Sequence, residues 1–135
     1  MSRLILFDSS VLIDHLRTGR HAERIETLSG LIRMSSVVLA ELWRGATKTA
    51  ERAFLKELER NHPVFTPTEK NWLESGHILA KIRADRGFST GKLRDLHFDV
   101  LIALTARSHG AWLIHSNRQD FELIQQYHPF QQEIW

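Results

Sequence analysis

Residues 3–10 read RLILFDSS, a short apolar run that ends in an acid and two serines. Its continuous apolar run predicts a buried strand over Arg3–Asp8. Either of the two serines can cap the helix that we expect over Val11–Arg17. Because a helix follows the strand at once, Asp8 is expected at the carboxyl end of a parallel strand. Open α/β sheets bind their ligands at that edge.

The remaining chain continues the same alternation of strands and helices. Further strands are expected at Leu31–Ser35, Val64–Phe65, Ala111–His115 and, as an edge strand, Phe130–Trp135. Further helices are expected at Ala22–Leu28, from about Val37 with Ser36 as its cap, at Lys48–Asn61, from Thr66 or Thr68 to Arg86, at Leu96–His109 and at Phe121–Gln126, with a loop at Phe88–Arg94. This order predicts one α/β/α domain over residues 1–135, with a central parallel sheet and helices on both faces.

The composition narrows the class of protein without naming an activity. The 135 residues are 42% hydrophobic and 25% charged, with a formal net charge of +2 and no cysteine. No apolar run approaches the roughly 18 residues of a membrane span, and the start of the chain is too short in apolar residues for a signal peptide. We therefore expect a cytoplasmic location, no membrane association and no thiolate chemistry.

Several acids stand where a core would be expected. Asp8 ends an apolar strand, Glu41 lies within VVLAELW and Asp99 lies within FDVLIAL. An unpaired buried carboxylate is costly, so something must compensate for its charge. Asp120 follows the strand expected at Ala111–His115 after a short turn, so it can reach the same edge of the sheet. We expect these four carboxylates to share one site.

Each acid also has an ordinary structural interpretation. Asp8 and Asp120 can be helix N-caps, and Glu41 can pair with Arg44 one helical turn later. Asp99 is the hardest to explain in this way because its neighbours are apolar on every side. The joint pattern favours a shared site.

A shared site of carboxylates implies a metal ion. Carboxylates that cluster without a cation repel one another and raise each other's pKa values. A hard divalent ion that prefers oxygen ligands, Mg²⁺ or Mn²⁺, removes this conflict. Such an ion can activate water and stabilise charge on a phosphoryl oxygen. An acid-only cluster therefore favours hydrolysis of phosphodiester bonds.

With these acids in place, nearly the whole chain resembles the PIN-domain family, and within it the VapC type of toxin. The resemblance rests on four motifs that occur in the family's order. They are FDSSVLID at Phe7–Asp14, SSVVLAELWRGA at Ser35–Ala46, FDVLIALTA at Phe98–Ala106, and the pair HGA and SNRQDF at His109–Ala111 and Ser116–Phe121.

The resemblance implies Asp8 and Asp99 as direct metal ligands, with Glu41 and Asp120 completing the catalytic pocket, some of them through water. It implies Mg²⁺-dependent, single-strand-specific cleavage of RNA by the toxin of a type II toxin–antitoxin pair. A homodimer and an antitoxin whose C-terminal segment blocks the site are implied as well. One position departs from the family, which usually has Thr two places before the Asn, where this chain has His115.

Basic residues supply candidate contacts to RNA phosphates. We favour a group close to Asp99 in the sequence, namely Arg83, Arg86, Lys92 and Arg94. A second series recurs every four residues at Arg44, Lys48, Arg52, Lys56 and Arg60. It forms either a phosphate track or a solvated helix face, and Gly45 can interrupt it. The four tryptophans are scattered through the chain, which favours core packing over base stacking.

Other functions remain open from the sequence. The chain could be a phospho-acceptor module that uses Asp8, although a second aspartate two residues later is absent and Glu41 and Asp99 would then have no role. It could be a catalytically inactive PIN-like module that binds RNA. A nuclease that cuts DNA also fits, because acids and a metal do not distinguish the two sugars.

Overall fold

A five-stranded sheet runs through the centre of the computed structural model, which describes residues 2–135. The strands are β1 (Leu4–Phe7), β2 (Leu31–Ser35), β3 (Val64–Phe65), β4 (Trp112–His115) and β5 (Gln132–Ile134). Their order across the sheet is β3-β2-β1-β4-β5, and every neighbouring pair is parallel. The expected α/β fold with a parallel sheet and a C-terminal edge strand is confirmed.

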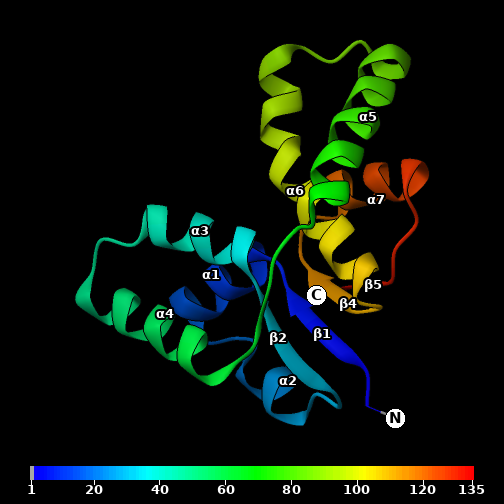
Figure 1. Ribbon diagram of the computed structural model, residues 1–135. Coiled ribbons are helices and arrows are strands. Elements are labelled where there is room, and N and C mark those ends of the chain that lie inside the picture. Colours follow the sequence, from blue (N-terminus) through cyan, green and yellow to red (C-terminus); the bar gives the residue numbers. More distant parts are fainter. Residues whose placement is uncertain (1) are drawn as a thin grey trace.

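Seven helices surround this sheet in the described residues. They are α1 (Ser9–Thr18), α2 (Ala22–Thr27), α3 (Ser36–Gly45), α4 (Thr49–Asn61), α5 (Glu69–Arg86), α6 (Thr90–Ser108) and α7 (Arg118–Tyr127). Figure 1 shows α1, α3 and α4 on one side of the sheet and α6 and α7 on the other. Helices α5 and α6 also extend beyond the sheet as a projecting pair (Figure 1). None of the helices in residues 2–135 is long and apolar enough to cross a membrane.

The core fixes three elements most firmly. Ile5 and Leu6 of β1 are fully buried, as are Leu113 and Ile114 of β4. The second half of α6 is buried on all sides over Val100–Ala106. A helix that is apolar all round must be enclosed by the protein. The end of β1, the end of β4 and the middle of α6 are therefore held rigidly relative to one another.

The loop expected at Phe88–Arg94 is wrong, because most of it is helical. Helix α5 ends at Gly87, which adopts a left-handed conformation with φ of 65°. The hydroxyl of Ser89 then accepts a hydrogen bond from the backbone N–H of Lys92 and caps α6. Gly91 has a low helix propensity, yet it lies in the first turn of α6. Packing of α6 against α5 outweighs that local preference.

Two helix caps and one tryptophan need comment. The side chain of Asp8 caps α1, as its structural interpretation allowed, in place of the serines that follow it, and Ser35 in place of Ser36 caps α3. Trp72 on α5 is 51% exposed, so core packing is the wrong interpretation for this residue.

Candidate metal-binding and catalytic site

Asp8 serves as a helix cap and still has a carboxylate oxygen to spare. Its Oδ2 accepts hydrogen bonds from the Ser10 hydroxyl at 2.6 Å and from the Ser10 backbone N–H at 3.2 Å. Its own backbone N–H donates to the carbonyl of Ile114 at 2.9 Å, which ties it to β4. Only 2% of the residue is exposed, and its buried Oδ1 has no hydrogen-bond partner within residues 2–135. Capping α1 therefore uses one of the two carboxylate oxygens, Oδ2, and does not involve Oδ1.

Glu41 approaches Asp8 from the second turn of α3. Burial and, to a lesser degree, the negative charge of Asp8 raise its pKa to about 6, against the opposing effect of the charge of Arg44. Its buried Oε1, like the Oδ1 of Asp8, has no hydrogen-bond partner in the described part of the chain. The expected interaction with Arg44 exists as a charge effect and leaves this oxygen unpaired.

Asp99 is the centre of the acidic cluster. Burial contributes most to raising its pKa to about 8, and the charges of Asp8, Asp120 and Glu41 contribute in decreasing order. Lys92, two turns earlier on α6, lowers this pKa. The structure thus brings together all four acids that the sequence singled out.

Asn117 joins two of these acids, a role that reasoning from the sequence did not assign. Its side-chain amide donates to Asp120 Oδ2 at 3.2 Å and to Asp99 Oδ2 at 3.4 Å. Asn117 also occupies the N-cap position of α7, so the interpretation of Asp120 as that helix's cap is wrong. Asp120 lies in the first turn, where its other oxygen is 3.8 Å from the ammonium of Lys92.

His115 holds the turn that carries Asn117. Its Nδ1 accepts a hydrogen bond from the backbone N–H of Asn117 at 3.1 Å, so its Nε2–H donates to Gln132 Oε1 at 2.7 Å. The ring is fully buried, and burial lowers its pKa, which favours this neutral form. His115 therefore fixes the backbone at Asn117, whose side chain contacts the acids.

Ser10 closes the link between the two central strands. Its hydroxyl donates to Asp8 and accepts from the backbone N–H of Ser116 at 3.1 Å. The sequence indicated Ser10 only as a candidate cap. Its second partner lies 106 positions away, which no local pattern reveals.

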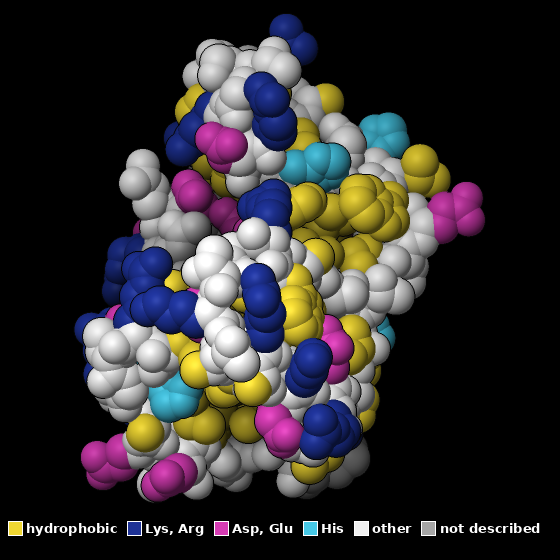
Figure 2. All heavy atoms as spheres, turned by 90° about the vertical axis from the view of Figure 1, so that its left-hand side faces the viewer, with side chains coloured by type: hydrophobic (Ala, Val, Ile, Leu, Met, Phe, Trp, Pro, Cys, Tyr) yellow, Lys and Arg dark blue, Asp and Glu magenta, His cyan; other side chains and the backbone are white. Residues whose placement is uncertain are grey.

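The topology explains why these residues meet. β1 pairs with β2 on one side and β4 on the other, so the strand order reverses at this point. Ligands of open α/β sheets bind beyond the carboxyl ends of the strands at such a position. Asp99 lies in the middle of α6 and not near its start, because the helix begins at Thr90. The first half of α6 extends beyond the sheet edge (Figure 1). In Figure 2 acidic side chains lie in a hollow below the projecting helices, with basic side chains around it.

The donor set fits a hard divalent cation. Two buried carboxylate oxygens, on Asp8 and Glu41, lack partners among the described residues and adjoin an acid whose pKa is raised by its neighbours. No three Asp, Glu or His side chains in residues 2–135 converge into a ready-made ligand cage. Mg²⁺ is commonly held by one or two carboxylates and keeps several of its waters. The cluster suits that mode of binding.

The candidate phosphate-binding residues are not all near the acids. Lys92 is the one that contacts the cluster, through Asp120. Arg86 donates to Gln126 of α7 at 2.7 Å, while Arg83 and Arg94 are exposed on the projecting helices. The second basic series is split between α3 and α4, and its last member, Arg60, is 2.9 Å from Glu57.

Comparison with known protein families gives a match to the model for the PIN domain over residues 5–126. The chain belongs to the PIN domain family. Comparison with curated proteins finds no significant match.

Several solved structures share this fold along nearly their whole length. VapBC2 from Rickettsia felis, bound to a DNA fragment from its promoter, has a TM-score of 0.72 at 19% identity, covering 98% of each chain. DNA-bound VapBC from Salmonella typhimurium has a TM-score of 0.74 at 23% identity, covering 100% of this chain and 99% of that one. A toxin–antitoxin complex from Klebsiella pneumoniae has a TM-score of 0.61 at 23% identity, covering 87% and 89%.

Replacing Asp99 by Asn should stabilise the metal-free protein at high pH. The folded chain holds the Asp99 proton up to about pH 8, whereas an ordinary aspartate releases it near 3.8. The unfolded chain therefore binds fewer protons over this interval, and the free energy of unfolding falls as pH rises through it. Removing on the order of 1 kcal/mol of charge repulsion would raise the Tm by about 3–5 °C. Thermal melts in chelator at pH 6 and pH 8.5 measure this gain, which should be larger at pH 8.5.

The same variant should gain less stability from Mg²⁺ than the parent protein, because a ligand stabilises the fold only through the site that it occupies. Melts with and without Mg²⁺ provide the comparison. An Asn variant that melts lower in chelator, and responds to Mg²⁺ as the parent does, would show that Asp99 is a structural hydrogen-bonding residue.

Proposed function

We propose that this chain is a Mg²⁺-dependent endoribonuclease, with Mn²⁺ as an alternative ion, and that it is the toxin of a type II toxin–antitoxin pair. The observation that carries the proposal is the proximity of four carboxylates, whose charges act on Asp99, at the switch point of a parallel sheet. Two of them have buried oxygens that lack partners within residues 2–135. Membership of the PIN family and the fold shared with toxin–antitoxin complexes support it.

In this proposal each acid has a distinct task. Asp8 and Asp99 hold the metal directly, and Glu41 and Asp120 complete the pocket, in part through water. A bound divalent ion activates water and stabilises the negative charge that develops on the phosphoryl oxygens. Asn117 keeps Asp99 and Asp120 in position through its two hydrogen bonds. Lys92, beside Asp120, offers a cation to the phosphate chain.

Replacing Asp8 or Asp99 by Asn should reduce Mg²⁺-dependent cleavage of single-stranded RNA by more than about 100-fold. Loss of outer-shell partners of a metal already costs about 10–100-fold, and a direct ligand contributes more. Cleavage of a labelled single-stranded RNA, with circular dichroism to verify the fold, measures the effect. A matched control is Asp85→Asn, which removes an exposed carboxylate on α5 that accepts from Tyr127. Near-native cleavage by either site variant would exclude the proposed metal site.

The same protein can be used to test whether RNA or DNA is the substrate. It can also be used to test whether the chain cleaves nucleic acid or accepts a phosphoryl group. Single-stranded RNA should be cut, while single-stranded DNA of equal sequence and duplex RNA should remain intact. Incubation with a labelled phosphoryl donor should leave no label on Asp8, which distinguishes a nuclease from a phospho-acceptor module.

Neutralising a cation that binds phosphate should flatten the salt dependence of RNA binding. We propose Arg83, Arg86, Lys92 and Arg94 as these cations. Removing one ion pair with a single-stranded phosphate chain lowers the slope of log affinity against log salt by about 0.7. Binding titrations of Lys92→Gln and Arg94→Gln measure this slope, with Arg60→Gln on α4 as the control. A slope that does not change would remove the substituted residue from the RNA path.

The antitoxin is proposed to dock in a groove that adjoins the acids at Glu41. This groove between α1, α3 and α4 is lined by Ile13, Leu16, Leu42 and Leu55, and Glu41 also lines it. An apolar helix or strand seated there would reach the acidic pocket. The toxin is further proposed to act in the cytoplasm as a homodimer, which analytical ultracentrifugation of the isolated chain tests.

Introducing a charge into this groove should release the toxin from inhibition. Ile13 is 37% exposed, so Ile13→Glu places a carboxylate on the groove surface without disturbing the core. We expect inhibition by the product of the adjacent short reading frame to weaken at least about 10-fold, because a desolvated charge is costly. Leu31→Glu is the control, since Leu31 is 46% exposed at the opposite end of the sheet. Equal inhibition of both variants would place the antitoxin elsewhere.

A further inference from the structure

An aromatic side chain and a cation face each other beside the acidic cluster. The guanidinium carbon of Arg44 lies 5.8 Å from the centre of the Phe98 ring. Arg44 comes from α3, one turn after Glu41, and Phe98 comes from α6, directly before Asp99. The pair therefore spans from one wall of the acidic site to the other.

Neither member of this pair is enclosed in the core, although Phe98 packs against its edge. Arg44 is exposed, and its charge reaches Glu41 without forming an ion pair. Phe98 is half-buried, in contrast to the fully buried run that begins at Val100. Trp72 on α5 is also exposed, at 51%, and it meets His97, the residue before Phe98, edge-on at 5.9 Å. In Figure 2 hydrophobic side chains gather beside the acidic hollow.

A nucleotide of a single strand presents a phosphate and an unpaired base close together. The phosphate is recognised by a guanidinium, which offers several donors in a plane. The base is recognised by an aromatic ring, on which any nucleobase can stack. A duplex hides its bases within the helical stack, so a ring at this position is useful only for an unpaired strand. The Arg44–Phe98 pair offers both groups beside the acids.

We infer that Arg44 and Phe98 form a nucleotide-binding subsite that stacks one unpaired base next to the phosphodiester bond that is cut. This inference rests on the proposed ribonuclease function and adds a physical source for single-strand selectivity. Phe98 stacks the base, and Arg44 swings from the ring to the adjacent phosphate. Trp72, which contacts the neighbouring His97, is available to the next base.

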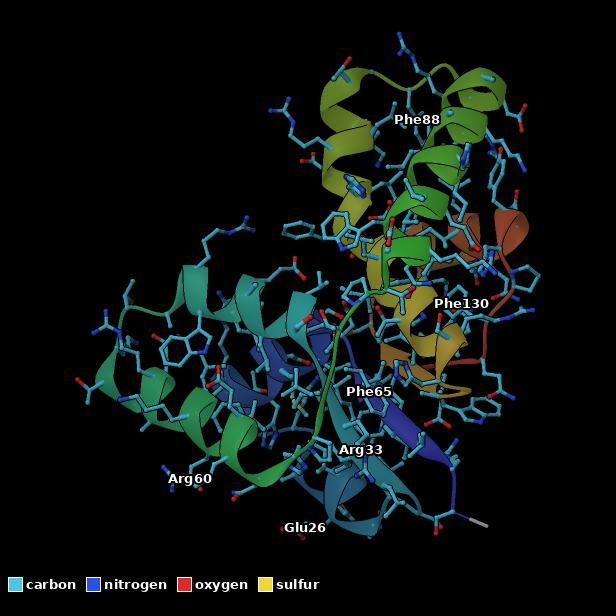
Figure 3. All side chains as sticks on the ribbon, in the orientation of Figure 1. Glu26, Arg33, Arg60, Phe65, Phe88 and Phe130 are labelled. Atoms are coloured by element: carbon cyan, nitrogen blue, oxygen red, sulfur yellow. The ribbon has the colours of Figure 1, made fainter. Side chains whose placement is uncertain are left out.

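The test removes the Phe98 ring from the protein, the flanking base from the RNA, or both. Phe98→Leu keeps an apolar side chain but has no aromatic face, and Phe98→Trp keeps the face. The substrate is a single-stranded RNA whose cleavage position has been mapped, with or without an abasic nucleotide next to that position. Phe88→Leu is the control, because Lys92 lies 5.6 Å over the Phe88 ring and Phe88 lies in the connection at the far end of the two projecting helices (Figure 3).

Loss of a stacked base should lower kcat/KM by about 5- to 100-fold. We expect this loss for Phe98→Leu on intact RNA and for the parent protein on RNA that is abasic on one side of the bond. The two losses should not add in the combination, since they remove the same contact. Phe98→Trp and Phe88→Leu should retain the parent's sensitivity to the missing base.

Binding provides a readout independent of turnover. RNA with 2-aminopurine at the flanking position, titrated with Ca²⁺ in place of Mg²⁺, should lose fluorescence on binding the parent protein and much less on binding Phe98→Leu. If the parent cleaves RNA and Phe98→Leu matches it in cleavage and in quenching, the subsite is excluded and the ribonuclease proposal stands. The subsite is also excluded if Phe98→Leu weakens only self-association or antitoxin binding. If the parent protein lowers the 2-aminopurine fluorescence but does not cleave the RNA, the subsite is supported and the nuclease function is contradicted. If the parent protein neither binds nor cleaves the RNA, both proposals are contradicted.

Discussion

Four carboxylates repel one another at the carboxyl edge of the sheet, and the rest of the structure holds them there. Parallel pairing of β1 with β4 places Asp8 beside the turn that carries Asn117. The enclosed half of α6 fixes Asp99 in the same space. Each of these constraints comes from buried apolar packing or backbone hydrogen bonds, which do not depend on the charge of the acids. The fold can therefore keep a strained electrostatic arrangement ready for a cation.

Much of the fold was predictable because its signals are local. The run LILF followed at once by Asp8 and a capped helix indicates a parallel strand with an acid at its carboxyl end. The same reasoning located all five strands and the four acids, whose apolar surroundings are visible in the sequence itself. Their meeting point followed from topology, since parallel strands place their carboxyl ends at one edge.

The parts that could not be predicted depend on contacts distant in sequence. Phe88–Arg94 contains Gly91 and small polar residues that favour a loop, and only packing against α5 makes the segment helical. That longer helix moves Asp99 from near a helix start to its middle. The second partner of Ser10 and the two acids bridged by Asn117 are set by strand pairing across the chain. Sequence reasoning found the charges but not the neutral side chains that position them.

The small net charge of +2 does not describe the local charge at this site. Asp8, Glu41, Asp99 and Asp120 lie together there, while Arg44 and Lys92 lie beside them. A phosphate approaching the acids alone meets negative charge, and a cation bound there reverses the sign of that field. Metal binding must therefore strengthen the binding of a polyanion, and by linkage the polyanion must strengthen the binding of the metal by the same factor. In the proposed function, the flanking cations would attract a nucleic acid to the surface, and the bound metal would determine whether its backbone can enter the acidic hollow.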